Sequence, residues 1–210
     1  MLLDAVHWIV DHPRIFLDAL ETHLLLSGAA LALAIALAAP LGVALTRYPR
    51  AAFATINGAG AMRTIPSIAI LAIMLPFLGI GFKPSLVALT ILAIPPILIN
   101  TYVGVRQVEP DIVDAARGMG MTAMQSVLRV ELPLAAPVMF AGVRTSAVQV
   151  IAGATLAAFI GGGGLGDFIT AGIAIMDLPR LLVGAVPIAL LAILTEFAFG
   201  GLERAMFRRG

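Results

Sequence analysis

An uninterrupted apolar run near the start of the chain limits what this protein can fold into more than any other feature. The run from Leu24 to Leu45 contains no charged side chain, and a helix of that length crosses about 30 Å of hydrocarbon. Of the 210 residues, 60% are hydrophobic and 12% are charged, more apolar surface than a water-soluble domain of this size buries. We therefore expect an all-α membrane protein, because a spanning helix satisfies its own backbone groups in lipid.

Four further segments have the length and composition of membrane spans, so that we expect five spans in a single domain, residues 1–210. The expected spans are 24–45, 64–80, 85–105, 134–160 and 181–202. The second is short and could begin earlier, within the alanine- and glycine-rich stretch 51–62. Residues 1–23 carry mostly acidic charges, and their apolar residues recur every three to four positions. This pattern indicates an amphipathic helix on the membrane surface rather than a cleavable signal.

The basic residues between the spans predict the orientation of the chain. Eight arginines fall on one side of the expected spans: Arg47, Arg50, Arg106, Arg117, Arg129, Arg204, Arg208 and Arg209. Only Arg14, Lys83 and Arg180 fall on the other side. Because cytoplasmic loops carry the excess of basic residues, we expect the N-terminus outside and the C-terminus inside the cytoplasmic membrane.

Several classes of function find no support in the composition. The net charge is +1, with no basic stripe to bind nucleic acid, and there is no cysteine for disulfides or thiolate metal sites. His7, His12 and His23 lack metal-ligand spacing and are interpreted as surface residues. No phosphate-binding glycine loop with its lysine occurs, and no catalytic residues are predicted.

The largest cytoplasmic insertion, residues 106–133, is interpreted as two short helices joined by a glycine turn. Glu109, Pro110 and Asp111 are typical of a helix start, with proline near the first position and acids at the positive end of the helix dipole. Gly120 permits the turn, and Thr122 is a candidate cap for a second helix that we expect to end at Pro133. Such an elbow is shaped to dock into a groove on another protein, although an ordinary surface hairpin remains the alternative.

The insertion resembles the "EAA" loop of binding-protein-dependent ABC importer permeases, which reads Glu-Ala-Ala, three residues, Gly, nine residues, Ile, one residue, Leu-Pro. This chain matches that spacing with Asp114-Ala115-Ala116, Gly120, Val130 and Leu132-Pro133. Asp114 stands for glutamate and Val130 for isoleucine, and both changes preserve charge or burial.

The resemblance implies a five-span type I importer permease fold, of the methionine-permease (MetI-like) kind. It also implies that the loop is the coupling element that inserts into a cytoplasmic ATPase, with alternating access driven through residues 111–124. The residues it assigns to ATPase coupling are Asp111, Asp114, Ala115, Ala116, Gly118, Gly120, Met121, Leu132 and Pro133. The implied partners are two ATPase subunits that bind ATP and magnesium, a second permease that is identical or homologous, and an extracytoplasmic binding protein. This chain would hold no cofactor itself.

Three further motifs resemble the osmoprotectant branch of the family, which imports glycine betaine, choline, carnitine and related quaternary amines. They are Thr64-Ile65-Pro66-Ser67-Ile68-Ala69, Pro76 with Gly79-Ile80-Gly81, and Phe159 to Gly166. Two alternatives stay open: a methionine-type amino-acid importer, which shares the size and the loop, and an ion-gradient-driven carrier. A non-transporting scaffold would leave the loop unexplained.

Polar groups within the expected spans are candidates for the translocation path, because such groups usually face a partner or water. Arg144 and Glu196 lie at overlapping depths, and we expect them to pair and hold helices together; pairing of Glu196 with Arg63 is the alternative. Asn100 lies at a similar depth, in the inner third of its span. Gln149, near mid-span, is a second candidate for the path, and helix–helix hydrogen bonding is the alternative.

Backbone irregularities add further candidates for the path or its gate. Pro95 and Pro96 deprive the carbonyls of Ile91 and Leu92 of amide donors, which predicts a kink that either lines the path or serves packing. The outer tetraglycine, Gly161, Gly162, Gly163 and Gly164, permits close backbone approach or a hinge, and by resemblance it forms part of the outer gate. Aromatic residues are too few within the spans for an obvious ammonium cage, so we expect the binding protein to select the solute.

Overall fold

The computed structural model describes residues 1–207, and every regular element within them is helical. Four helices are long and apolar enough to cross a membrane: α2 (Pro13–Leu45), α5 (Phe82–Arg106), the continuous helix from α7 to η2, and α10 (Leu178–Phe207). A fifth span is formed if α3 (Pro49–Met62) and α4 (Ser67–Leu78) count as one broken span, bent by 101°. The predicted all-α, five-span architecture is therefore confirmed.

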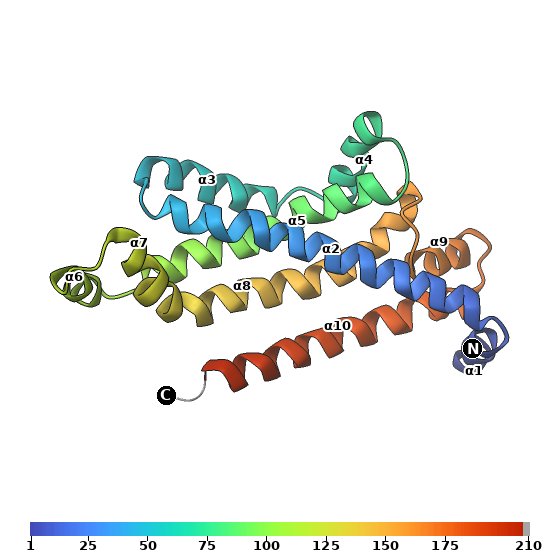
Figure 1. Ribbon diagram of the computed structural model, residues 1–210. Helices are drawn as coiled ribbons and strands as arrows, with labels where there is room; N and C mark the ends of the chain where they lie inside the picture. Colours follow the sequence, from blue (N-terminus) through green and yellow to red (C-terminus); the bar gives the residue numbers. More distant parts are fainter. Residues whose placement is uncertain (208–210) are drawn as a thin grey trace.

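Helix α5 lies at the centre of the bundle, between α2 and the third long helix, whose main part is α8 (Leu132–Gly153). Glycines permit this close packing: a Cβ on Gly42 of α2 would lie 2.8 Å from Thr101, and one on Gly142 of α8 would lie 2.7 Å from Asn100. Helix α10 runs along one side of the bundle and α3 along the other (Figure 1). Small residues thus hold the spans together, as is usual where lipid removes the hydrophobic drive for helix association.

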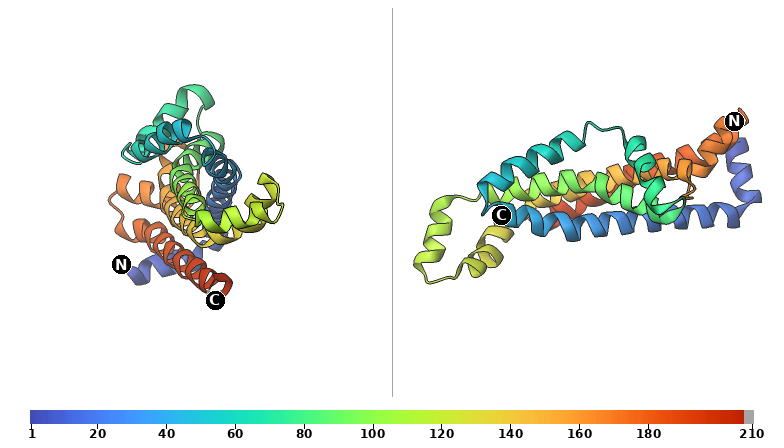
Figure 2. Two further views of the ribbon diagram at one scale, coloured as in Figure 1. Left: turned by 90° about the vertical axis from the view of Figure 1, so that its left-hand side faces the viewer. Right: turned by 90° about the horizontal axis from the view of Figure 1, so that it is seen from above.

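The short helices lie at the two ends of the bundle. At one end α6 (Pro110–Gly118) and α7 (Ala123–Ser126) project beyond the ends of α2 and α5 (Figure 2, right). At the other end lie α1 (Leu2–Asp11) and α9 (Gly166–Ala174), where Trp8 and Phe168 pack edge to face with ring centroids 5.1 Å apart.

The two groups of basic residues lie at opposite ends of the bundle. The end that bears α6 holds the start of α3 and the ends of α5 and α10, which carry Arg50, Arg106 and Arg204 (Figure 1). Arg117 lies in α6, and Arg47 follows the end of α2. Lys83 and Arg180 lie in the first turns of α5 and α10, at the opposite end. Arg208 and Arg209, also assigned to the larger group, lie outside the described residues.

The helix boundaries of the first, second and last spans differ from the sequence-based ones. Residues 1–23 form not one helix but α1 and the first turns of α2, since the backbone breaks at His12 and Pro13 begins a new helix. The second span begins at Pro49 and is interrupted between Met62 and Ser67. The last span extends from Leu178 to Phe207, longer than 181–202.

The expectation that Pro133 ends the preceding helix is wrong. A π-helical turn, η1 (Val127–Glu131), leads directly into α8, and the Leu132 amide donates to the Val127 carbonyl. Pro133 therefore lies inside a helix that is continuous from α7 to η2, directly after the π turn. The wide turn absorbs the irregularity that a proline would otherwise force on the helix.

Candidate coupling loop and translocation path

Helix α6 forms the first half of the predicted elbow. Pro110 is its first residue, Glu109 its N-cap and Asp111 its first-turn acid, as expected from the sequence. Only Ala116 is buried, at 1% exposure, whereas Asp114, Ala115 and Gly118 are exposed. Apart from the Ala116 side, α6 is therefore free to contact another protein.

Gly120 ends α6 in a Schellman motif, a helix end closed by two backbone hydrogen bonds around a left-handed residue. The Met121 amide donates to the Ala116 carbonyl at 3.2 Å, and the Gly120 amide donates to the Arg117 carbonyl at 2.9 Å. The φ of Gly120 is +85°, although a Cβ there would meet nothing within 4 Å. The motif glycine is thus required by backbone conformation and not by crowding.

Thr122 starts the second half of the elbow with a capping box. The Gln125 amide donates to the Thr122 hydroxyl at 3.3 Å, and the Thr122 amide donates to the Gln125 side-chain oxygen at 2.9 Å. These reciprocal bonds satisfy two amides that a helix start leaves free. The predicted cap is therefore confirmed.

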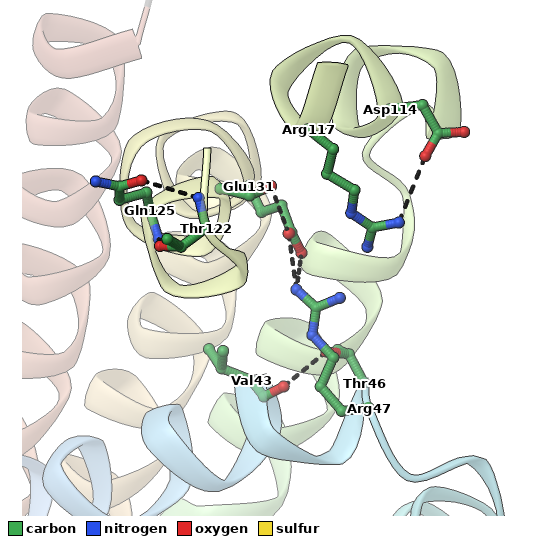
Figure 3. A network of polar contacts seen from close by, with 9 residues as sticks. Val43, Thr46, Arg47, Asp114, Arg117, Thr122, Gln125 and Glu131 are labelled. Atoms are coloured by element: carbon green, nitrogen blue, oxygen red, sulfur yellow. Dashed lines mark hydrogen bonds and ion pairs between the residues drawn. The ribbon is translucent and has the colours of Figure 1, made fainter. Parts of the chain in front are cut away.

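A buried carboxylate, Glu131, joins this elbow to the end of α2 (Figure 3). Its two oxygens accept from one Arg47 nitrogen at 2.7 and 2.9 Å, and the Ser126 hydroxyl donates to it at 3.1 Å. Glu131 is 4% exposed. Sequence reasoning missed this network, although an acid at the start of one span and an arginine at the end of another were its signal.

The remaining motif residues lie near this network. Asp114 and Glu131 line one cavity of about 250 Å³ between the ends of α2 and α5 and the helix α6. Within α6, Asp114 and Arg117 form an exposed ion pair at 3.4 Å. Leu132 is half-buried and Pro133 is exposed in the first turn of α8.

The predicted ion pair between Arg144 and Glu196 is confirmed, and a second carboxylate joins it. Arg144 of α8 contacts Glu196 and also donates to Glu203 of α10 at 2.9 Å. A Cβ on Gly200 would lie 3.4 Å from the guanidinium, so this glycine gives the arginine room between the two acids. Glu196 and Glu203 are seven residues apart, two turns on one face of α10, which is the signal that sequence reasoning overlooked.

The other path candidates divide into packing residues and cavity residues. Asn100 donates to the Pro96 carbonyl at 2.8 Å and faces Gly142 across the α5–α8 contact, and Pro96 is buried. Pro95 and Gln149 line a small cavity of about 30 Å³ together with Arg63. Arg63 thus forms no ion pair with Glu196, contrary to the alternative pairing.

The tetraglycine makes close backbone contacts at the other end of the bundle. A Cβ on Gly162 would lie 2.2 Å from the Ser85 hydroxyl, and one on Gly164 would lie 3.3 Å from His23. The Gly81 amide donates to the Ile160 carbonyl at 2.7 Å, which ties this segment to the start of α5. Close approach is therefore established here, whereas the gate role stays a prediction.

One histidine was wrongly interpreted as a surface residue. His23 is fully buried, and its Nε2 lies 3.0 Å from the carbonyl of Ile151. Helix α2 begins at Pro13, before the expected start of the span at Leu24, and His23 lies on its buried side. Across residues 1–207 no group of three potential metal ligands occurs.

Comparison with known proteins shows to which family the chain belongs. A family model described as "binding-protein-dependent transport system inner membrane component" matches residues 30–208, which include the whole elbow. The chain belongs to this family. It is a transport permease, and the resemblance drawn from the Asp114-Ala115-Ala116 motif is confirmed.

Similar curated permeases share much more than the motif. The carnitine transport permease protein OpuCB of Listeria monocytogenes is 49% identical over 181 residues, 86% of this chain and 83% of that protein. The glycine betaine/carnitine/choline transport system permease protein OpuCB of Bacillus subtilis is 44% identical over 188 residues, 90% and 87% of the two chains. The osmoprotectant import permease protein OsmW of Salmonella typhimurium is 35% identical over 213 residues, 99% of each chain.

A solved structure shares the fold. The inward-facing MetNI methionine ABC transporter contains a chain with a TM-score of 0.81 and 24% identity, covering 93% of this chain and 98% of that one. The type I importer permease fold implied by the sequence is therefore confirmed.

Proposed function

We propose that this chain is the membrane-spanning subunit of an ATP-driven importer of osmoprotectants, quaternary amines such as glycine betaine, carnitine or choline. The observation that carries the proposal is the 44–49% identity, over most of the chain, to permeases named for these solutes. The fold similarity to a methionine transporter at 24% identity supports the architecture and not that solute. An ion-gradient-driven carrier would leave the elbow without a role.

The elbow would receive the force of ATP hydrolysis from a separate cytoplasmic ATPase that binds ATP and magnesium. Its exposed surface combines the acids Asp111 and Asp114 with apolar side chains, of which Met119 is 72% exposed and Met124 66%. Exposed apolar groups at the end of the bundle, beside charges, suit a groove on a partner protein. The end that bears α6 would accordingly face the cytoplasm, with the N-terminus outside.

Movement of the elbow would reach the spans through two connections. The π turn η1 continues into α8, and the Glu131–Arg47 pair links the same turn to α2. π turns inside helices are frequent at functional sites. A docked elbow would therefore move α2 and α8 together.

A complete importer would contain two permeases, two ATPase subunits and one extracytoplasmic binding protein. The half-exposed cluster of Arg144, Glu196 and Glu203 supports a second permease or a water-filled path against this face, because charges facing lipid are expensive. Aromatic residues make up only 6% of the chain, which supports solute selection by the binding protein.

The test is reconstitution of the chain with its ATPase and binding protein in liposomes. ATP should drive uptake of labelled glycine betaine, and a non-hydrolysable ATP analogue should not. Uptake driven by an ion gradient without ATP would contradict the proposal. Labelled methionine serves as the matched solute: selective uptake of methionine would favour the amino-acid importer.

A further inference from the structure

Arg63 occupies an unusual place in the bundle, at the break of the bent span. It follows α3 directly, and residues 63–66 connect it to α4. The cavity that Arg63 lines is also lined by Pro95, in the middle of α5, and by Gln149 of α8. The guanidinium therefore belongs to a residue near the middle depth of the membrane-spanning bundle.

No carboxylate of residues 1–207 pairs with Arg63. Glu196 and Glu203 pair with Arg144, and Glu131 pairs with Arg47. The helices α3, α4 and α5 contain no acidic residue at all. A charged arginine at this depth is costly unless it faces water or an anionic partner. Arg63 is exposed.

The surroundings of Arg63 are polar. Ser67 and Gln149 line the same cavity and add a hydroxyl and an amide. Ile91 and Leu92 line it too, and Pro95 and Pro96 deprive their carbonyls of helical amide donors. The cavity volume of about 30 Å³ is that of about one water molecule, so a larger ligand would bind at its mouth. Irregular backbone is tolerated within a membrane where it lines such a polar, water-accessible space.

We propose that Arg63 binds the carboxylate of the solute during passage and so distinguishes carboxylated quaternary amines from choline. A guanidinium matches a carboxylate with two parallel hydrogen bonds, and Gln149 adds a further amide donor. Glycine betaine and carnitine carry a carboxylate and an ammonium, whereas choline carries only the ammonium, which Arg63 repels. This inference rests on the proposed function for its solutes.

A single-cysteine reporter tests the site without the binding protein. The chain contains no cysteine, so Ser67→Cys introduces a unique thiol beside Arg63. A charged methanethiosulfonate reagent should modify this thiol, and it should leave Leu71→Cys, on the fully buried side of α4, unmodified. Failure to modify Ser67→Cys under conditions that label an exposed control would show that no water reaches the site and would overturn the proposal.

Protection by solutes then identifies the ligand group. Millimolar glycine betaine should slow modification of Ser67→Cys at least about threefold, and choline should not. The protection should disappear in the double variant with Arg63→Gln. Equal protection by both solutes, or protection that survives Arg63→Gln, would overturn the role of Arg63.

Uptake by the reconstituted importer separates this inference from the proposed function. Arg63→Gln should lower kcat/KM for glycine betaine about tenfold or more, which corresponds to about 1.4 kcal/mol, while choline uptake stays at or above the wild-type rate. The kcat/KM of Arg63→Lys for glycine betaine should fall between the values of the wild type and of Arg63→Gln. Loss of uptake for both solutes in Arg63→Gln would mean a structural role, whereas wild-type protein without ATP-driven uptake of either solute would refute the proposed function alone.

Discussion

At the scale of single residues, the conformation of Gly120 explains why a glycine stands at this position of the loop. Its φ of +85° lies in the left-handed region, and the two hydrogen bonds around it fix the angle between α6 and α7. There is open space where a Cβ would lie, so a side chain would strain the backbone without clashing. The elbow's shape therefore depends on this one backbone conformation.

Gly120→Val is expected to uncouple transport while leaving membrane insertion intact. The left-handed conformation costs a β-branched residue about 1–2 kcal/mol, which corresponds to about five- to thirtyfold in the population of the correct elbow. ATP-driven uptake should fall by that factor, measured against the amount of inserted protein. Gly58→Val is the matched control, because Gly58 lies in the helix α3, outside the elbow, and has open space around it. Full uptake by Gly120→Val would contradict the coupling assignment.

Glu131→Gln is expected to lower both the thermal stability and the uptake of the protein. The substitution leaves Arg47 without its partner at a buried site, a loss of about 1–3 kcal/mol once screening of Arg47, whose side chain is 39% exposed, is included. Thermal unfolding in detergent measures the first effect and vesicle uptake the second.

The control for this experiment is Arg117→Gln. Arg117 belongs to an exposed pair at 3.4 Å, so its removal should change the unfolding temperature little. Equal melting of the wild type and Glu131→Gln would show that the buried network does not stabilise the joint between the elbow and α2.

At the scale of elements, hydropathy predicts the spans but not their internal irregularities. The charge-free run 24–45 and the proline-containing run 85–105 both lie within long helices because burial in lipid alone selects such sequences. The break after Met62 and the π turn before Leu132 each lie beside a proline, Pro66 and Pro133, but hydropathy alone indicates neither irregularity. Cap and turn residues such as Thr122 were predictable because their hydrogen bonds are local.

Gly162→Ala is expected to destabilise the end of the bundle opposite to α6. A Cβ there would lie 2.2 Å from the Ser85 hydroxyl and 2.8 Å from Ala157, which is overpacking at a cost of about 1–3 kcal/mol. The unfolding temperature in detergent should fall. Gly58→Ala in α3 has open space and should not lower it. Unchanged stability of Gly162→Ala would show that the tetraglycine segment yields easily, as a hinge would.

The charged cluster between α8 and α10 is expected to serve assembly more than solute contact. Arg144→Gln removes both ion pairs and should reduce the amount of assembled importer, measured by gel filtration, more than Glu196→Gln, which leaves the pair with Glu203. Uptake per assembled complex should stay near the wild-type value for Glu196→Gln. Normal assembly with altered solute transport would instead place Glu196 in the path.

At the scale of the whole molecule, the chain is one component of a transport system. The arginine-rich end carries the elbow, and the opposite end carries the tetraglycine and α9 (Figure 1). Family and fold were predictable from the sequence because the motif residues of the loop stand at a characteristic spacing, and the solute branch was predicted from three further motifs. The pairings of Arg47 and Glu203 were not predicted, because both residues lie just outside the expected spans 24–45 and 181–202, where a charge does not stand out.

The most direct test of whether the elbow contacts the ATPase is photocross-linking of the assembled importer. Met119→Cys, carrying a maleimide benzophenone, should form a covalent adduct with the ATPase subunit, because Met119 is exposed on the elbow. The same probe at Met176→Cys, 95% exposed at the opposite end, should not reach the ATPase. An ATPase adduct from position 176, or none from position 119, would contradict the account.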